Sequence, residues 1–174
     1  MSAIDFKRVI PTILTQEHDC SNFTTCGKQQ IDDFIHREAV DFQNERLGVS
    51  YVFRYDGEII GFVTLSMADL KREKLTSSDR LQIGKENYPA LQISQLAASQ
   101  KLGDKDIGTF LCDFSLAKAY QLSESVGCRF LVLNSKKDVV GFYEKYGFRL
   151  LPKQEGRREP VMFLNIFSKI HITM

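Results

Sequence analysis

The fold is decided by residues 90–116, which read ALQISQLAASQKLGDKDIGTFLCDFSL. The first part, Ala90–Ala98, is a short and largely apolar run, and such a run predicts a strand. A loop of glycine and charged residues, Gly103–Asp106, comes next. The apolar residues that follow recur at helical spacing, at Ile107, Phe110, Leu111 and Phe114. A strand that passes through a short loop into a helix is a building unit of α/β proteins.

Upstream of this stretch, the chain predicts a helix and a hairpin. Ile31–Gln43 has apolar residues at helical spacing with charges between them. Two strand-like runs, Val49–Tyr55 and Glu58–Ser66, are joined by Asp56-Gly57, a pair typical of the tight type I′ turn. The polar segment Lys71–Lys85 predicts a loop, which leads to the strand that begins at Ala90.

Downstream, the chain predicts a strand, a short helix and a final strand. Arg129–Leu133 is a compact apolar run, typical of a strand. Asp138 and Gly147 are expected to cap the start and the end of a helix over Val139–Tyr146. Val161–Ile170 predicts one last strand or a pair of short ones.

The order helix, hairpin, strand, helix, strand, helix, strand predicts a mixed α/β fold. Strand–helix–strand units after residue 90 imply parallel pairing in that part, whereas the hairpin is antiparallel. A chain of 174 residues without an internal repeat or a Pro/Ser-rich linker is expected to form a single domain, residues 1–174.

The composition excludes several classes of protein. Apolar residues make up 43% of the chain, which is too many for a disordered or collagen-like sequence. The 23 Lys and Arg residues nearly balance the 22 Asp and Glu residues, and the formal charge is +1. This balance excludes an overall basic coat for nucleic acid and an acidic tail, and is compatible with a local basic patch.

The cysteines and histidines do not form a metal-binding pattern. No Cys-x-x-Cys occurs, and His18, His36 and His171 are scattered, so zinc spacing is missing. The N-terminus lacks the charged and apolar regions of a signal peptide, and no apolar run is long enough to span a membrane. We therefore expect free thiols in a cytoplasmic protein without a metal or a membrane segment. The cysteines are Cys20, Cys26, Cys112 and Cys128.

The loop that enters the second helix is a candidate anion site. Unpaired backbone N–H groups and the positive end of the helix dipole favour phosphate at a helix start. Gly103 and Gly108 bracket this turn, and Thr109 lies in the first helical turn. The alternative is an ordinary connecting loop, because many strand–helix loops carry two glycines.

Two tyrosines form the second candidate feature. Tyr143 and Tyr146 are three residues apart and share one face of the predicted helix. Rings in this arrangement commonly pack in the core. A phenol that reaches a cleft could instead donate a proton to a leaving group.

Together, and in this order, these features resemble the GNAT (GCN5-related N-acetyltransferase) superfamily. The segment FYEKYGF at 142–148 resembles the last motif of these enzymes, and Ile93–Ala98 resembles their central strand. The N-terminal segments Phe23–Gly27 and Ile31–Ile35 are similar to a subfamily that includes the TacT-like toxins. Those toxins acetylate the amino group of aminoacyl-tRNA and are paired with ribbon-helix-helix antitoxins.

The resemblance implies a GNAT fold and a set of site residues. The fold would be a mixed sheet with an antiparallel N-terminal hairpin, parallel central strands splayed around acyl-CoA, and helices on both faces. Acetyl-CoA would be the co-substrate, and the phenol of Tyr143 would protonate the departing thiolate as general acid. The residues implied to bind acetyl-CoA are Leu96, Ala97, Ala98, Gly103, Asp104, Lys105, Asp106, Ile107, Gly108, Thr109, Asn134 and Phe142.

The candidate loop departs from the family pattern, Gln/Arg-x-x-Gly-x-Gly/Ala. Counting from Leu96 places the pattern on residues 103–108, where only Gly108 fits, while helical periodicity from Ile107 favours this register. The alternative register, Gln100-x-x-Gly103, leaves the loop three residues short. The carboxylates of Asp104 and Asp106 would lie near the pyrophosphate and repel it. Lys101 and Lys105 would offset part of this repulsion.

No general base for the acceptor amine is evident. Asp113 and Glu144 are helix residues of the kind that usually carries solvated surface charge. Cys112 and Cys128 fit small buried residues better than nucleophiles, because no histidine is placed to activate them. An α-amine with a pKa near about 8 could lose its proton to a chain of water molecules.

Three readings of the acceptor remain open. The first is a toxin that acetylates aminoacyl-tRNA beside a ribbon-helix-helix antitoxin, which requires a basic face for phosphates. The second is an enzyme that acetylates a small amine, a protein lysine or a protein N-terminus, and the third is a catalytically weak protein-binding module. The assembly is open, with a homodimer as one alternative. The candidate RNA contacts, interleaved with acidic residues, are Lys71, Arg72, Lys74, Arg80, Arg149, Lys153, Arg157 and Arg158.

Overall fold

The computed structural model describes residues 4–25, 27–102 and 106–168. The chain divides into two compact units, Met1–Ser66 with Ser94–Phe114 and Met67–Ile93 with Ser115–Met174. Strands β3 (Glu58–Lys71) and β4 (Asn87–Ala98) and helix α3 (Asp106–Ser125) contribute residues to both units. The expectation of a single domain stays a prediction.

Seven strands and four helices confirm the predicted mixed α/β class among the described residues. The hydrogen-bonding order of the strands is β1-β2-β3-β4-β5-β7-β6. The remaining bounds are β1 (Ile10–Ile13), α1 (Gln29–Asp33), α2 (Ala39–Asn44), β2 (Val49–Tyr55), β5 (Phe130–Asn134), α4 (Val140–Tyr146), β6 (Arg149–Leu150) and β7 (Val161–Asn165).

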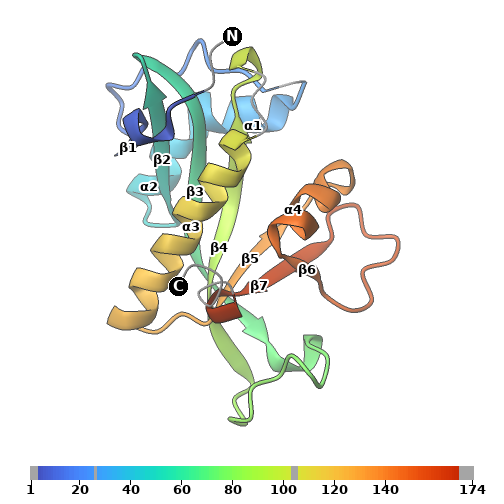
Figure 1. The fold of residues 1–174 in the computed structure, drawn as a ribbon. Coiled ribbons are helices and arrows are strands. Elements are labelled where there is room, and N and C mark those ends of the chain that lie inside the picture. The colour runs from blue at the N-terminus through green and yellow to red at the C-terminus, as the bar shows by residue number, and fades with distance from the viewer. Residues whose placement is uncertain (1–3, 26, 103–105, 169–174) are drawn as a thin grey trace. The chain divides into compact units, whose positions relative to one another are not determined.

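In the first unit, the first part of α3 lies on one side of the hairpin strands, and α1 and α2 lie on the other side (Figure 1). Val52 of β2 is fully buried in a core with Phe34 and Ile35, from the helical stretch that joins α1 to α2. Phe53, the next residue, meets Phe114 of α3 edge-on, with 4.9 Å between the ring centroids. Because successive side chains of a strand point to opposite faces, the hairpin is covered on both sides.

The turn of the hairpin is the predicted type I′. Asp56 and Gly57 have φ values of 49° and 88°, the left-handed conformation that this turn requires at both central residues. β2 and β3 pair antiparallel from Val49↔Leu65 to Tyr55↔Glu58, with a register shift between Phe53 and Arg54. Strand β1, which the sequence did not predict, adds to this ladder antiparallel to β2.

In the second unit, the strand pairing corrects part of the prediction. β4 and β5 pair in parallel from Ala90↔Phe130 to Ile93↔Leu133, as expected for a strand–helix–strand unit. β7, however, is antiparallel to β5, because the short strand β6 follows α4 and forms a hairpin with β7. β6 therefore runs in the direction of β5, and β7 lies between them in the strand order.

The ends of two predicted elements also differ. Asp138 lies inside the 3₁₀ turn Lys137–Val139 rather than at the N-cap position of α4, which is Val139, and the side chain of Val139 makes no capping hydrogen bond. Gly147 ends α4 as predicted, with a φ of 120°. The last strand is shorter than Val161–Ile170, because the chain turns into the 3₁₀ helix Ile166–Ser168 after β7.

Candidate functional site

The C-terminal end of β4 holds the first group of predicted binding residues. Ala97 is buried, whereas Leu96 and Ala98 are half-buried. The parallel ladder with β5 ends at Ile93, so these three residues lie past its last pair. The N–H of Ser99 donates to the carbonyl oxygen of Ile60 at 2.8 Å, which ties the end of β4 to β3.

The helix that the apolar spacing from Ile107 predicted is present after β4, and the register of the family pattern on residues 103–108 stays a prediction. α3 begins at Asp106, and Ile107 is fully buried. Asp106 and Thr109 are exposed, and Gly108 is half-buried. The first N–H groups of a helix have no partner within the helix and lie at the positive end of its dipole, and α3 is 20 residues long. Gly103, Asp104 and Lys105, which the sequence also assigned to this site, lie outside the described residues.

Two successive sets of hydrogen bonds hold the chain between β4 and α3. The N–H of Gln100 donates to the carbonyl oxygen of Thr24 at 3.0 Å, and Gln100–Leu102 forms a 3₁₀ turn. Thr24 and Thr25 in turn donate hydrogen bonds to the buried carboxylate of Asp32. Sequence reasoning singled out these segments only for their resemblance to toxins and did not connect them with the loop.

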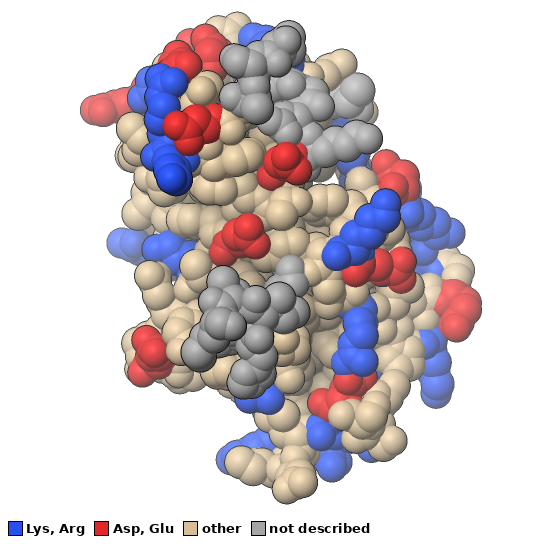
Figure 2. Space-filling view, viewed as in Figure 1, with Lys and Arg blue, Asp and Glu red and all other residues tan. Residues whose placement is uncertain are grey.

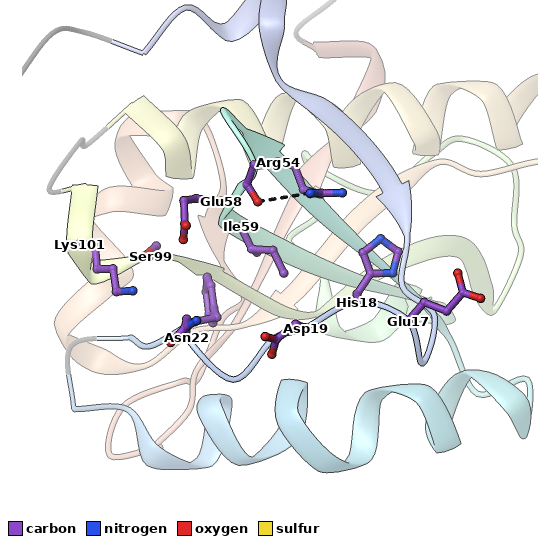
Figure 3. A pocket seen from close by; sticks show the side chains of 11 residues that line it. Glu17, His18, Asp19, Asn22, Arg54, Glu58, Ile59, Ser99 and Lys101 are labelled. Carbon is purple, nitrogen blue, oxygen red and sulfur yellow. Dashed lines mark hydrogen bonds between the residues drawn. The ribbon is translucent and has the colours of Figure 1, made fainter.

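A polar hollow of 590 Å³ lies beside the same segment, also in the first unit (Figure 3). Ser99 and Lys101 line it next to β4, and Arg54 and Glu58 come from the hairpin. The imidazole of His18 is held at Nδ1 by the Thr15 N–H at 3.1 Å, so the neutral ring carries its proton on Nε2. Glu17 and Asp19 also line the hollow, so its charge is mixed.

The second group of predicted residues belongs to the second unit. Tyr143 is buried, with 8% of its surface exposed, and its ring lies 5.0 Å from that of Phe142 and 5.6 Å from that of Phe148. Tyr146 is also buried, 5.8 Å from Phe148. Both rings therefore belong to an aromatic cluster, as the core interpretation expected. Asn134, at the end of β5, is exposed.

The other candidates behave as ordinary surface or core residues. Asp113 and Glu144 are exposed, as expected for surface charge. Cys20, Cys112 and Cys128 are buried free thiols, and burial raises the pKa of Cys20 and Cys128, which keeps these thiols protonated. Within residues 4–25, 27–102 and 106–168, no group of three or more His, Cys, Asp and Glu side chains could hold a metal ion. Cys26 lies outside the described residues.

The predicted basic residues have two kinds of role. Arg80 is structural: its Nε donates to the carbonyl oxygens of Arg72 and Leu75, both at 3.1 Å. Arg149 forms a salt bridge with Asp79. The remaining residues are mostly exposed and interspersed with acids, and the visible surface shows the same mixture of charges (Figure 2).

One hollow gathers several of the basic side chains. Its volume is 470 Å³, and it lies in the second unit, lined by residues between the end of β3 and the start of β4. The guanidinium Nε of Arg72 is buried there without a hydrogen-bond partner among the described residues. The cations that line it are Lys71, Arg72, Arg80 and Lys85, and the carboxylates are Glu73 and Glu86.

No helix in the described part of the chain is long and apolar enough to cross a membrane.

Residues 13–148, well over half of the chain, match the model of the acetyltransferase (GNAT) family. A tRNA-acetylating toxin of Mycobacterium tuberculosis (strain ATCC 25618 / H37Rv) is 21% identical over 143 residues, which are 82% of this chain and 85% of the toxin.

Solved structures of toxins share the fold. AtaT complexed with acetyl-methionyl-tRNAfMet has a TM-score of 0.83 at 21% identity, over 95% of this chain and 99% of that chain. A mutant AtaT toxin bound to the C-terminus of the antitoxin AtaR and acetyl-CoA has a TM-score of 0.75 at 19% identity, over 95% and 99% of the two chains. The predicted similarity to toxin-type GNAT proteins is confirmed, and the family match identifies this chain as an acyltransferase that belongs to the acetyltransferase (GNAT) family.

Proposed function

We propose that this protein transfers the acetyl group of acetyl-CoA to the amino group of an aminoacyl-tRNA. As a member of the GNAT family it uses acetyl-CoA as co-substrate. The proposal for the acceptor rests on one observation: the curated relative that spans 82% of the chain is a tRNA-acetylating toxin. By the same similarity, we propose a ribbon-helix-helix antitoxin as partner. Because charged tRNA is used in the cytoplasm, we propose that the protein acts there.

The residues at the end of β4 and the start of α3 fit acetyl-CoA. The backbone of Leu96 and Ala98, past the end of the ladder with β5, can pair with the pantetheine amides as an added strand does. The N–H groups at the start of α3 can hold the pyrophosphate without help from side chains. The exposed carboxylate of Asp106 is screened by solvent, so its repulsion costs below about 1 kcal/mol.

The reaction requires hydrogen-bond donors to the carbonyl oxygen of the thioester and a proton donor to the leaving sulfur. The acceptor nitrogen forms a bond to the thioester carbonyl carbon, the carbon–sulfur bond breaks, and the sulfur leaves as thiolate. Backbone N–H groups at the end of β4, around Ala98, stabilise the negative charge that develops on the carbonyl oxygen. The phenol of Tyr143 donates a proton to the departing sulfur. The nitrogen loses its proton to water, since no base is assigned.

The proposed RNA contacts are the exposed cations of the second unit. Lys71, which lines the hollow next to Arg72, is exposed, and so is Lys74, three residues farther along the chain. Lysine and arginine contacts to phosphates give nucleic-acid affinity that falls steeply with salt. Arg80 bonds to backbone carbonyl oxygens and Arg149 forms a salt bridge with Asp79. We therefore propose that these two residues stabilise the surface and do not contact RNA.

The first test is binding of acetyl-CoA, measured by calorimetry beside desulfo-CoA and free CoA. We expect a dissociation constant in the micromolar range, about −8 kcal/mol. If none of the three ligands binds, the protein is a GNAT-fold module that acts through protein contacts, and the proposal is wrong.

The second test is transfer of labelled acetyl to a panel of aminoacyl-tRNAs, with uncharged tRNA as control. We expect label on the charged tRNAs, recovered as N-acetyl amino acid after alkaline hydrolysis. Lys71→Ala with Lys74→Ala should weaken tRNA binding at low salt and flatten its salt dependence, whereas Lys7→Ala, at an exposed lysine of the first unit, should not. Acetylation of small amines without transfer to any charged tRNA would support the second reading, which the net charge of +1 favours.

A further inference from the structure

Asp32 is a buried carboxylate that accepts three hydrogen bonds. Only 8% of its surface is exposed. One carboxylate oxygen accepts the backbone N–H of Thr25 at 2.9 Å and its hydroxyl at 2.8 Å, and the other accepts the hydroxyl of Thr24 at 3.2 Å. Burial of a carboxylate is costly unless such bonds compensate it, so this group fixes the two threonines in one arrangement.

One of these threonines, Thr24, also holds the chain where it leaves β4. The N–H of Ser99 still bonds within the sheet, to the carbonyl oxygen of Ile60 at 2.8 Å. The next N–H, that of Gln100, bonds to the carbonyl oxygen of Thr24 at 3.0 Å. The hydrogen-bond partner of the backbone therefore changes from strand β3 at Ser99 to Thr24 at Gln100. Four residues of the first unit thus form a chain of hydrogen bonds from Asp32 to Gln100.

Gln100 begins the segment that leads to the start of α3. In the proposed function, the N–H groups of that helix start hold the pyrophosphate, so their position depends on how the preceding chain leaves β4. Backbone donors bind only if the backbone is fixed, and in the favoured register residues 103–108 keep only Gly108 of the family pattern. The chain of bonds from Asp32 supplies such a fixed point.

A role confined to helix α1 does not explain this arrangement. An acidic residue in the first turn of a helix is stabilised by the dipole whether or not it is buried. Asp32 lies in the first turn of α1, yet it is buried and bonded outside the helix, whereas Asp33, the last residue of α1, is half-buried and accepts a hydrogen bond within the helix, from the side chain of Gln29 at 3.1 Å. Asp33 thus provides a matched carboxylate in the same helix.

We infer that Asp32 is a positioning residue for acetyl-CoA, which acts through Thr24 and Thr25 on the backbone of Gln100. This inference rests on the proposed function of the α3 start. It assigns no contact with the substrate to Asp32, and it predicts an effect on the affinity for acetyl-CoA rather than on the chemical step.

The test compares Asp32→Asn with Asp33→Asn, which make the same change of charge at neighbouring positions. Amide hydrogen exchange, measured by NMR without acetyl-CoA, should be about tenfold faster at Gln100 in Asp32→Asn and unchanged at Ser99. The dissociation constant of acetyl-CoA should rise about tenfold, while kcat at saturating acetyl-CoA stays within about twofold. Asp33→Asn should change none of these quantities.

A second pair of variants keeps the test decisive if Asp32→Asn folds poorly. Thr25→Ser retains the hydroxyl that bonds to Asp32 and should behave as the wild type, whereas Thr25→Val should reproduce the effects of Asp32→Asn. Equal acceleration at Ser99 and Gln100, or an unchanged affinity, would overturn the inference. If the wild type itself does not bind acetyl-CoA, the proposed function and this role both fail, and the exchange data still show whether the chain of bonds exists.

Discussion

The start of α3 and helix α4 are both proposed to act on acetyl-CoA, but the first would act through its backbone and the second through a side chain. At the start of α3 the proposed donors are backbone N–H groups, and residues 103–108 keep only Gly108 of the family pattern. In α4 the proposed donor is the phenol of Tyr143, and the segment 142–148 keeps the family motif.

This difference follows from the chemistry that each segment performs. Every residue except proline carries a backbone N–H, so a phosphate site made of such groups tolerates substitutions as long as the backbone keeps its path. A proton donor depends on one functional group with one acidity, and its neighbours must hold it in place. The first segment should therefore be sensitive to backbone position, and the second to a single atom.

Tyr143→Phe should produce the largest effect, because it removes that atom and keeps the ring. We expect kcat to fall by at least about 100-fold, while the affinity for acetyl-CoA stays nearly unchanged. Steady-state kinetics and calorimetry measure the two quantities. Tyr146→Phe removes the other buried phenol of the same helix and should change kcat by no more than about threefold. Full turnover by Tyr143→Phe would remove the acid role from this residue.

Gly61→Ala tests the other side of the comparison, the position of the backbone. A Cβ on Gly61 would lie 3.0 Å from the carbonyl oxygen of Ala97, 3.0 Å from Leu111 and 3.3 Å from Ile107. Because this methyl group would press against both β4 and the first turns of α3, we expect a loss of about 1–3 kcal/mol in the free energy of unfolding and weaker binding of acetyl-CoA.

Urea unfolding and calorimetry check this prediction. Gly84→Ala is the control, since no atom of the described residues lies within 4 Å of the added Cβ, and its effect on stability should stay within about 0.5 kcal/mol. A loss of stability without any loss of affinity would show that the end of β4 and the start of α3 do not bind acetyl-CoA.

The features that the sequence could predict are those that depend on nearby residues. The Asp56-Gly57 turn, the helical spacing from Ile107 and the end of α4 at Gly147 are local, and all three are confirmed. The exposed strand β1 and the two-residue strand β6 are held by pairing with strands that are distant in sequence. No local pattern distinguishes such short edge strands from loops.

The candidate site divides in the same way. Family motifs identify Tyr143 and the strand end at Ala98, because each motif is a contiguous stretch. The hydrogen bonds that Thr24 and Thr25 donate to Asp32, and the one that the Gln100 N–H donates to Thr24, join segments up to 76 positions apart (100 minus 24). The seven-residue spacing of Thr25 and Asp32 was the available signal, and it becomes informative only once the fold brings the end of β4 to the same place.

Asp106→Asn sharpens the comparison with a smaller effect. Because the carboxylate is exposed at the start of α3, its loss should strengthen binding of acetyl-CoA by about two- to threefold at low salt and by less at high salt. Calorimetry at two salt concentrations measures this change, and Asp113→Asn, an exposed carboxylate farther along α3, should have no effect. Weaker binding would mean that Asp106 matters more by stabilising the helix start than by repelling the anion.

The salt bridge between Asp79 and Arg149 is expected to stabilise the chain after α4 by a small and pH-dependent amount. Burial favours a higher pKa of Asp79, but hydrogen bonds from the hydroxyl of Thr76 and from Arg149 outweigh it and lower the pKa. The stabilisation is therefore complete above the pKa of the unfolded state, about 3.9, and is lost as the pH falls through the lower pKa of the folded state. Asp79→Asn should lower the free energy of unfolding at neutral pH by no more than about 1 kcal/mol, because Arg149 is 59% exposed. Urea unfolding should show this difference closing in acid, and a difference that persists there would mean that Asp79 acts through packing rather than through its charge.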